Sequence, residues 1–304
     1  MTFRNFKPVK QMTGSLITGV FFLILFSLAA CSSAPKKPAE IFVDRNMAAN
    51  QLDLAIRTAN QGLYADALLI LEDARRFAVS SDDPPLLIKT SIARGNFLFS
   101  LGLHDEAFLD WEAAREEGEI SGERDLAILA RIYAVRGRLV LMTGAGTKTG
   151  AEEIRDQVNG LISSIKSNRL ALATGYLVLG MAEKELEHYP ESERALRRAL
   201  DIHEKDRYLE EAAYDWYFMA SVFSVAGRYD DALAALQTAI AFDRRAENGF
   251  GLASSWQAVG EVYLKKNLAE ESVRAFYRAA DIFRAIGLEE SASKAEARAV
   301  TAGL

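Results

Sequence analysis

The feature that most constrains the fold of this chain is a repeat of 40 residues. Tyr176, Trp216 and Trp256 follow one another at this interval. The same interval separates the members of three further sets: Gly180, Ala220 and Gly260; Leu196, Leu236 and Phe276; and Ala199, Ala239 and Ala279. A fixed period of about 20 to 50 residues is typical of proteins that stack copies of one small structural unit.

Two amphipathic helices are predicted within each unit, because apolar residues recur every three or four positions. The segments 216–227 (WYFMASVFSVAG) and 231–242 (DALAALQTAIAF) show this spacing clearly. A small residue in the first helix lets the second helix approach closely, and we expect it at Ala55, Gly95, Gly180, Ala220 and Gly260. Large side chains are expected to fill the seam at Leu54, Met219, Val259, Leu71, Leu236 and Phe276. One such hairpin cannot bury its apolar face alone, so the units must stack.

The repeat extends over most of the chain. Ala67 and Ala107 continue the 40-residue interval toward the N-terminus, and the 85 residues from Ala107 to Ser192 leave room for two slightly longer units. We therefore expect six units in residues 47–287, with a degenerate third unit near residues 129–172. Residues 288–304 are polar with small alanines, which predicts a terminal helix that caps the last unit. The expected fold is an all-α solenoid.

The pattern resembles the tetratricopeptide repeat (TPR), whose signature is W-x2-L-G-x2-Y, then G-x-Y-x2-A, then F-x2-A. The fifth unit carries Trp216, Met219, Ala220, Phe223, Gly227, Tyr229, Ala232, Leu236 and Ala239, and the sixth carries Trp256, Val259, Gly260, Tyr263, Phe276 and Ala279. Two features depart from the family. The period is 40 rather than about 34 residues, and Arg244 and Arg284 replace the proline that ends the second helix. A HEAT-like or other α-solenoid is the alternative fold.

Residues 1–30 have the organisation of an export signal peptide. Arg4, Lys7 and Lys10 precede an apolar run that ends in small residues, LAAC, at Cys31. This ending resembles the lipobox of bacterial lipoproteins. The resemblance implies cleavage before Cys31, lipidation of that cysteine and acylation of its amine with a fatty acid such as palmitate. An uncleaved anchor helix is the alternative, although the apolar run is short for a membrane span of about 20 residues.

Residues 31–46 begin with a stretch rich in Ser, Ala, Pro and Lys, which predicts a flexible tether between the lipid and the folded part. Cys31 is the only cysteine of the chain, so it is free for this use. Ser32, where aspartate would favour inner-membrane retention, favours an outer membrane. We expect a lipid-anchored domain outside the cytoplasm, on the cell membrane or the outer membrane. Residues 1–30 hold three basic and no acidic side chains, so cleavage changes the net charge from -6 to -9, which argues against nucleic acid as a partner.

A glycine-rich loop at residues 144–150 (GAGTKTG) has the composition of a phosphate-binding loop. A P-loop needs glycines where this chain has Met142 and Thr147, and the dinucleotide fingerprint needs a third glycine where it has Thr149. The run before the loop carries apolar residues at helical rather than strand spacing. We interpret the loop as the turn between the two helices of the degenerate third unit.

The sequence contains no pattern that indicates catalysis, a metal or a cofactor. His104, His188 and His203 have no cysteine or histidine at the spacing of metal ligands. Acidic pairs lie on polar helix faces, often four residues from Arg or Lys, which favours surface ion pairs. No nucleophile elbow is present. We expect a protein that is not an enzyme and that binds neither a metal nor a cofactor.

The TPR resemblance also implies a partner site in a concave groove lined by the first helices. Carried onto this chain, the groove positions are Asn96, Phe99, Leu177, Met181, Lys184, Tyr214, Tyr217, Ser221, Gln257 and Glu261. Tyr214 and Tyr217 are either an amphipathic contact surface for a partner or packing against a neighbouring helix, and the sequence favours neither.

Two functions remain open. The first is a membrane-anchored scaffold that binds a protein or peptide in its groove and serves assembly of the cell envelope. TPR lipoproteins in outer-membrane protein insertion, pilus assembly and cell-wall enzyme scaffolding are the resemblance behind it. The second is an accessory lipoprotein that binds a small ligand beside a solute transporter.

Overall fold

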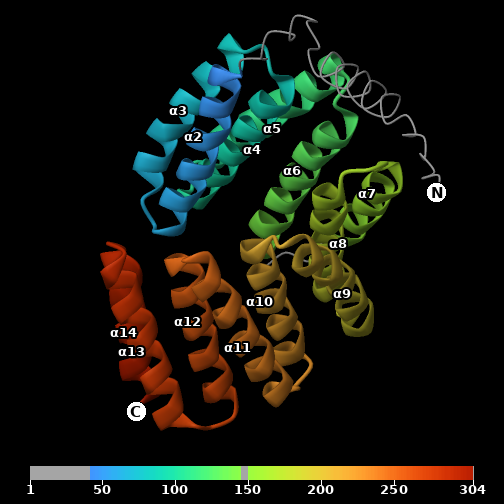
Figure 1. Cartoon of the computed structure of the whole chain (residues 1–304). Coiled ribbons are helices and arrows are strands. Elements are labelled where there is room, and N and C mark those ends of the chain that lie inside the picture. Colours follow the sequence, from blue (N-terminus) through green and yellow to red (C-terminus); the bar gives the residue numbers. More distant parts are fainter. Residues whose placement is uncertain (1–41, 145–149, 304) are drawn as a thin grey trace, which may run out of the picture. The chain divides into compact units, whose positions relative to one another are not determined.

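The computed structural model describes residues 42–144 and 150–303, and all of them belong to one compact unit that begins at Phe42. The predicted signal peptide, Cys31 and most of the predicted tether lie outside the described residues, as do positions 145–149 of the glycine-rich loop. The described part is helical with short turns (Figure 1). None of its helices is long and apolar enough to cross a membrane.

Six helix hairpins follow one another along the described chain, and a single helix follows them. Their bounds are α2 (Val43–Asn60) and α3 (Tyr64–Ser80), α4 (Pro84–Ser100) and α5 (His104–Ser121), α6 (Arg124–Gly144) and α7 (Ala151–Ser164), α8 (Arg169–Glu185) and α9 (Tyr189–Asp206), α10 (Leu209–Val225) and α11 (Tyr229–Ala246), α12 (Gly249–Lys265) and α13 (Ala269–Ala285), and finally α14 (Glu289–Ala302). This order confirms the predicted solenoid of hairpins with a terminal helix. We call α2, α4, α6, α8, α10 and α12 the first helices, and their partners the second helices.

The small residues of the first helices lie where the second helices come closest. A Cβ atom added at Gly95 would lie 2.6 Å from the Trp111 indole, and one at Gly180 would lie 2.7 Å from Leu196. The hydroxyl of Ser192 donates to the Gly180 carbonyl oxygen at 2.6 Å, which is possible only because both residues are small. The repeat spacing thus encodes the closest contact of each regular hairpin.

The large side chains fill the seam as predicted at five of the six expected positions. Leu71, Leu236, Phe276, Met219 and Val259 are fully buried. The prediction is wrong for Leu54, which is 47% exposed. Leu54 occupies the same position as Met219 and Val259, which α10 and α12 bury against the preceding second helices, but no described helix hairpin precedes α2 to cover it.

The third hairpin is the irregular one, as expected from its sequence. Val135 and Ile154 stand where the other hairpins carry small residues, and α7 packs mainly against α8 rather than against α6. The run before the glycine-rich loop is helical through Gly144, and α7 begins at Ala151. Asp125 accepts hydrogen bonds from three successive backbone N–H groups, at Lys166, Ser167 and Asn168, and so holds the turn between α7 and α8.

The first hairpin also contacts hairpins that are distant in the sequence. Asn60, the last residue of α2, donates to Glu210 of α10 at 2.6 Å. The Tyr64 and Phe250 rings meet edge to face with centroids 6.4 Å apart. Leu288, before α14, lies against Gly62. These contacts bring α2 and α10 to the same polar region, which is the candidate site.

Candidate binding channel along the first helices

Four cavities share lining residues and follow one another along the first helices. The α2–α4 cavity (about 430 Å³) and the central cavity (about 220 Å³) have Asn96, Tyr133, Glu210 and Glu211 in common. The central cavity shares Glu210, Tyr214 and Asn248 with the next cavity (about 350 Å³), formed by the N-terminal parts of α10 and α12. That cavity shares Tyr217 and Ser254 with the last one (about 290 Å³), between the C-terminal parts of the same helices. We call the four together the channel.

The central cavity is the most polar part of the channel. Helices α4, α6, α8, α9 and α10 and the turn before α12 supply its lining, which consists of Asn96, Tyr133, Arg136, Thr174, Leu177, His203, Glu210, Glu211, Tyr214 and Asn248. The cavity is therefore lined by side chains from the second to the fifth hairpin and from the turn that opens the sixth.

A fully buried, hydrogen-bonded couple, His203 and Asp215, lies beside the central cavity, and His203 lines it. The His203 Nδ1 atom lies 2.7 Å from Asp215 Oδ2, and both side chains are 0% exposed. Burial raises the pKa of Asp215 to about 6, although the hydrogen bond from His203 opposes the rise. Which of the two atoms donates depends on the tautomer of the His203 ring. The Nε2 atom of His203 has no hydrogen-bond partner among the described residues.

The two residues of this couple occupy a recurring position at the junction between consecutive hairpins. A second helix contributes one residue, and the following first helix contributes another one 12 positions later. The corresponding pairs are Ala78 with Thr90, Gly118 with Ala130, His203 with Asp215, Asp243 with Ser255, and Phe283 with Ala295. Of these five junctions, only the two on either side of hairpin α10–α11 carry ionisable residues at this position. From the sequence, each histidine was considered alone, and the pairing of His203 with Asp215 was not predicted. Their separation of 12 residues, which the other junction pairs share, would have indicated it.

Asp243, at the next junction, is also buried, at 2% exposure. Its Oδ1 accepts from Asn248 Nδ2 at 2.8 Å, and its Oδ2 accepts from the Ser255 hydroxyl at 3.5 Å. Burial raises the pKa of Asp243 to about 7, because these neutral donors replace only part of its hydration. Asp243, Asn248 and Ser255 all line the cavity between the N-terminal parts of α10 and α12.

Glu210 belongs to three of the four cavities and links them. Burial, followed by the charge of the neighbouring Glu211, raises its pKa to about 7, and the hydrogen bond from Asn60 opposes the rise. Arg136 is the one basic side chain in the lining of the central cavity, and its guanidinium lies 4.7 Å from the centre of the Tyr133 ring. The channel therefore holds several carboxyl groups that are costly to ionise without a partner.

Six of the predicted polar or aromatic groove residues line the channel: Asn96, Tyr214, Tyr217, Ser221, Gln257 and Glu261. The apolar Leu177 also reaches the central cavity. The Oδ1 atom of Asn96 is buried and has no hydrogen-bond partner in the part of the chain that the structure describes. Tyr214 and Tyr217 stack on each other with centroids 6.3 Å apart. The Nε and Nη2 atoms of Arg298, in α14, donate to the two carboxylate oxygens of Glu261 at 2.8 and 2.6 Å.

Phe99, Met181 and Lys184 lie away from the four cavities. Phe99 packs on the Trp111 ring, and Met181 is buried in the core. The Lys184 ammonium lies over the Phe218 ring and pairs with Glu185. The partner-binding role of the groove residues as a set stays a prediction.

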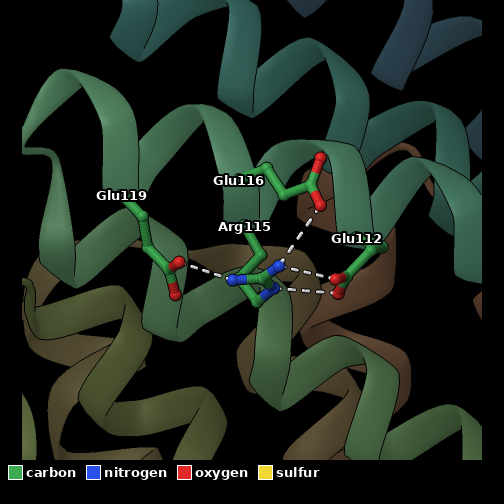
Figure 2. A network of polar contacts seen from close by, with 4 residues as sticks. All are labelled: Glu112, Arg115, Glu116 and Glu119. Carbon is green, nitrogen blue, oxygen red and sulfur yellow. Dashed lines mark hydrogen bonds and ion pairs between the residues drawn. The ribbon is translucent and has the colours of Figure 1, made fainter.

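Acidic clusters elsewhere in the described residues pair on the surface. Figure 2 shows Arg115 of α5, whose guanidinium contacts Glu112 at 2.6 Å, Glu119 at 2.5 Å and Glu116 at 3.4 Å. The hydrogen bonds from Arg115 lower the pKa of Glu112. Across residues 42–144 and 150–303, no three His, Cys, Asp or Glu side chains are arranged to hold a metal ion.

Comparison with known proteins identifies the fold. No protein-family model matches the sequence, and no curated protein matches it in sequence. Solved structures do match. A STAND signal-transduction ATPase with a tetratricopeptide repeat sensor from Pyrococcus horikoshii aligns with 80% of this chain at a TM-score of 0.56 and 13% identity. The chain has a TPR-like fold.

Two further structures support this fold. The APC/C hetero-tetramer Cut9–Hcn1 aligns with 94% of the chain, at a TM-score of 0.55 and 16% identity. A Rap protein complexed with Competence and Sporulation Factor aligns with 83% of it, at a TM-score of 0.52 and 13% identity. The chain spans 43% of the ATPase, 47% of the APC/C chain and 73% of the Rap protein. At these identities the likeness establishes the fold alone.

Proposed function

We propose that this protein is a lipid-anchored TPR scaffold, on the outer side of a bacterial membrane, that binds an extended segment of a protein partner in its channel and serves assembly of the cell envelope. The observation that carries the binding role is the channel itself. It runs along several first helices, exposes stacked tyrosines and is lined by residues with buried polar atoms that have no partner within residues 42–144 and 150–303. Such atoms are destabilising in an empty site and favourable once a ligand satisfies them.

The structural relatives support a role in binding. The Rap protein of similar fold is complexed with a factor, and Cut9 belongs to a hetero-tetramer. A groove along the first helices of a repeat protein is the usual extended binding surface of such folds. The channel lies on that face here.

Cross-linking in living cells tests the protein partner. A photoreactive amino acid replaces Gln257, which lines the last cavity, in the full-length chain. The control replaces Leu109 on α5, which is 70% exposed and lines none of the four cavities. We expect a cross-linked polypeptide at position 257 and not at position 109. Equal cross-linking at both positions, or none at position 257, would contradict a protein partner in the channel.

The lipid anchor rests on the LAAC ending at Cys31. A Cys31→Ala variant should leave the membrane fraction, and globomycin should cause the uncleaved form of the unaltered protein to accumulate. An unchanged membrane distribution of the variant would rule out lipid anchoring through this cysteine. Cross-linking through position 257 tests the channel separately from the anchor.

The second candidate function is that of a ligand-binding accessory of a solute transporter. The size of the central cavity, about 220 Å³, favours it, because a small polar molecule would fill this volume. Native mass spectrometry of the full-length chain, released gently from detergent, decides between the two. A co-purified small molecule combined with absent cross-links at position 257 would favour the accessory role.

A further inference from the structure

We propose that the central cavity recognises a cationic group, a primary ammonium or a guanidinium, on the molecule that occupies the channel. The inference rests on the proposed binding function and adds the chemistry of the occupant. The partner segment would be one that presents a lysine or arginine side chain to His203, Asn96 and the two glutamates at the start of α10.

The first argument is that the unpartnered buried atoms of the cavity are hydrogen-bond acceptors. The His203 Nδ1 atom lies 2.7 Å from Asp215 Oδ2. When a neutral ring donates its Nδ1–H to this carboxylate, Nε2 carries a lone pair and is an acceptor. That atom is fully buried and has no partner among the described residues. The carbonyl oxygen of the Asn96 side chain is in the same state. Both residues line the cavity, and the two atoms themselves are buried. A local movement of these side chains would bring the atoms to an occupant rich in N–H donors, which would satisfy them.

The second argument is the balance of charge. Glu210 and Glu211 both line the central cavity, and Arg136 is the single basic side chain there. Asp215 lies behind His203, and Asp243 lies in the adjacent cavity. Arg136 is engaged with the face of Tyr133, and Glu210 accepts a neutral hydrogen bond from Asn60. Lys89 lines the α2–α4 cavity, which also contains Glu210 and Glu211. The four carboxyl groups outnumber the two basic side chains, Arg136 and Lys89, and an added cation improves the balance.

The third argument is the aromatic wall. Tyr133 and Tyr214 both line the central cavity, and Tyr217 stacks on Tyr214 toward the next cavity. Tyr214 is 38% exposed, so its ring remains accessible to an occupant of the channel. A cation over a tyrosine face gains about 0.5 to 2 kcal/mol, more where water is excluded. Carboxylates, acceptor atoms and tyrosine faces in one cavity are the elements that bind ammonium and guanidinium groups.

The polar junctions give the fourth argument. Repeat proteins can fill this position with small or apolar residues, as Gly118 with Ala130 and Phe283 with Ala295 do in this chain. Replacement of a buried ion pair by apolar residues is often neutral or stabilising. The two junctions that carry ionisable residues are those that border the channel. Their placement is explained if the ligand, rather than the fold, needs them.

Three peptides that differ in a single side chain, cationic, neutral or anionic, test the proposal on the full-length chain in detergent. The probes are acetyl-Ala-Lys-Ala-amide, its norleucine counterpart and its glutamate counterpart. The readout is the NMR signal of the His203 ring in protein with isotope-labelled histidine. The exposed His188 and the surface His104 serve as internal controls. We expect the lysine peptide to shift the His203 signal in a saturable manner, and the norleucine peptide to leave it in place.

A matched pair of variants localises the charge. Glu211→Gln should weaken binding of the lysine peptide about tenfold, which corresponds to about 1.4 kcal/mol. Glu270→Gln, at an exposed glutamate in the first turn of α13, should leave binding unchanged. Should Glu211→Gln fail to fold, the peptide comparison on the unaltered chain still decides.

Two outcomes would overturn the inference. One is tighter binding of the glutamate peptide than of the lysine peptide, which would make Arg136 the determinant. The other is a His203 signal that no peptide moves. In either case, cross-links at position 257 that persist would leave the protein-binding function intact. Loss of those cross-links would refute the proposed function instead.

Discussion

Asp243 offers a direct test of how the two junctions with ionisable residues, His203 with Asp215 and Asp243 with Ser255, affect stability. Burial raises the pKa of its carboxyl from 3.8 to about 7, although the hydrogen bonds from Asn248 and Ser255 oppose the rise. In the unfolded chain the same carboxyl titrates near its ordinary value of about 4. Between about pH 4 and about pH 7 the folded protein therefore keeps a proton that the unfolded chain has lost. The free energy of unfolding must fall as the pH rises through this window.

The width of the window sets the magnitude. A rise from 3.8 to about 7, at about 1.4 kcal/mol for each pH unit, corresponds to about 4 kcal/mol. The side chain of the Asp243→Asn variant has no proton to lose. Its loss of stability between about pH 4 and about pH 8 should therefore be about 4 kcal/mol smaller than that of the unaltered protein. Urea unfolding followed by circular dichroism at both pH values measures the difference.

Two other buried carboxyls, Glu210 and Asp215, have raised pKa values and are present in both proteins. The charge of Asp243 contributes to the raised pKa of Glu210, so its removal lowers that pKa and changes the comparison in the expected direction. Asp231→Asn, which removes an exposed carboxylate from the same helix, is the control for a general change in charge. Equal pH dependence in the Asp243→Asn variant and the unaltered protein would refute the reasoning, because the carboxyl would then titrate alike in the folded and unfolded chains.

Three further predictions concern packing and hydrogen bonds, each checked by urea unfolding. Gly180→Ala should destabilise by about 1 to 3 kcal/mol, because the new Cβ would lie 2.7 Å from Leu196. Gly160→Ala, with open space around the same atom in α7, should stabilise by up to about 1 kcal/mol, and a loss at both positions would contradict the packing argument. Asp125→Ala should destabilise by about 1 to 3 kcal/mol, since three backbone N–H groups lose their acceptor; an unchanged midpoint would show that water replaces it. Asn60→Ala should destabilise by a similar amount, because it removes the hydrogen-bond donor to Glu210. An unchanged midpoint would show that this contact between the first and fifth hairpins does not stabilise the fold.

The hairpins themselves could be predicted from sequence because their packing is local. A small residue at Gly180 and a leucine at Leu196 determine one close contact inside one unit, and the same contact recurs every 40 residues. Leu54 shows the limit of this reasoning. It has the same register as the buried Met219 and Val259, but its burial needs a preceding hairpin, which α2 lacks among the described residues, and it is 47% exposed.

The channel could be predicted only in part, because it depends on how successive hairpins are oriented. Met181, Ser221 and Glu261 occupy the same position of their units. Ser221 and Glu261 line the last cavity, whereas Met181 is buried in the core. Register within a unit therefore does not decide which side chain reaches the channel. The polar junctions were missed for a related reason, since the partners belong to different units.

The contacts of Asn60 with Glu210, and of Gly62 with Leu288, have a consequence for how the chain unfolds. A repeat array whose units touch only their neighbours can fray from either end, and its cooperativity decays with length. Here the first hairpin loses part of its support whenever the fifth hairpin or the start of α14 opens. Fraying at one terminus therefore destabilises the other, which favours a single cooperative transition over stepwise unravelling. These pairings, about 150 and 226 residues apart in sequence, also raise the contact order and should slow folding relative to an array with neighbour contacts alone.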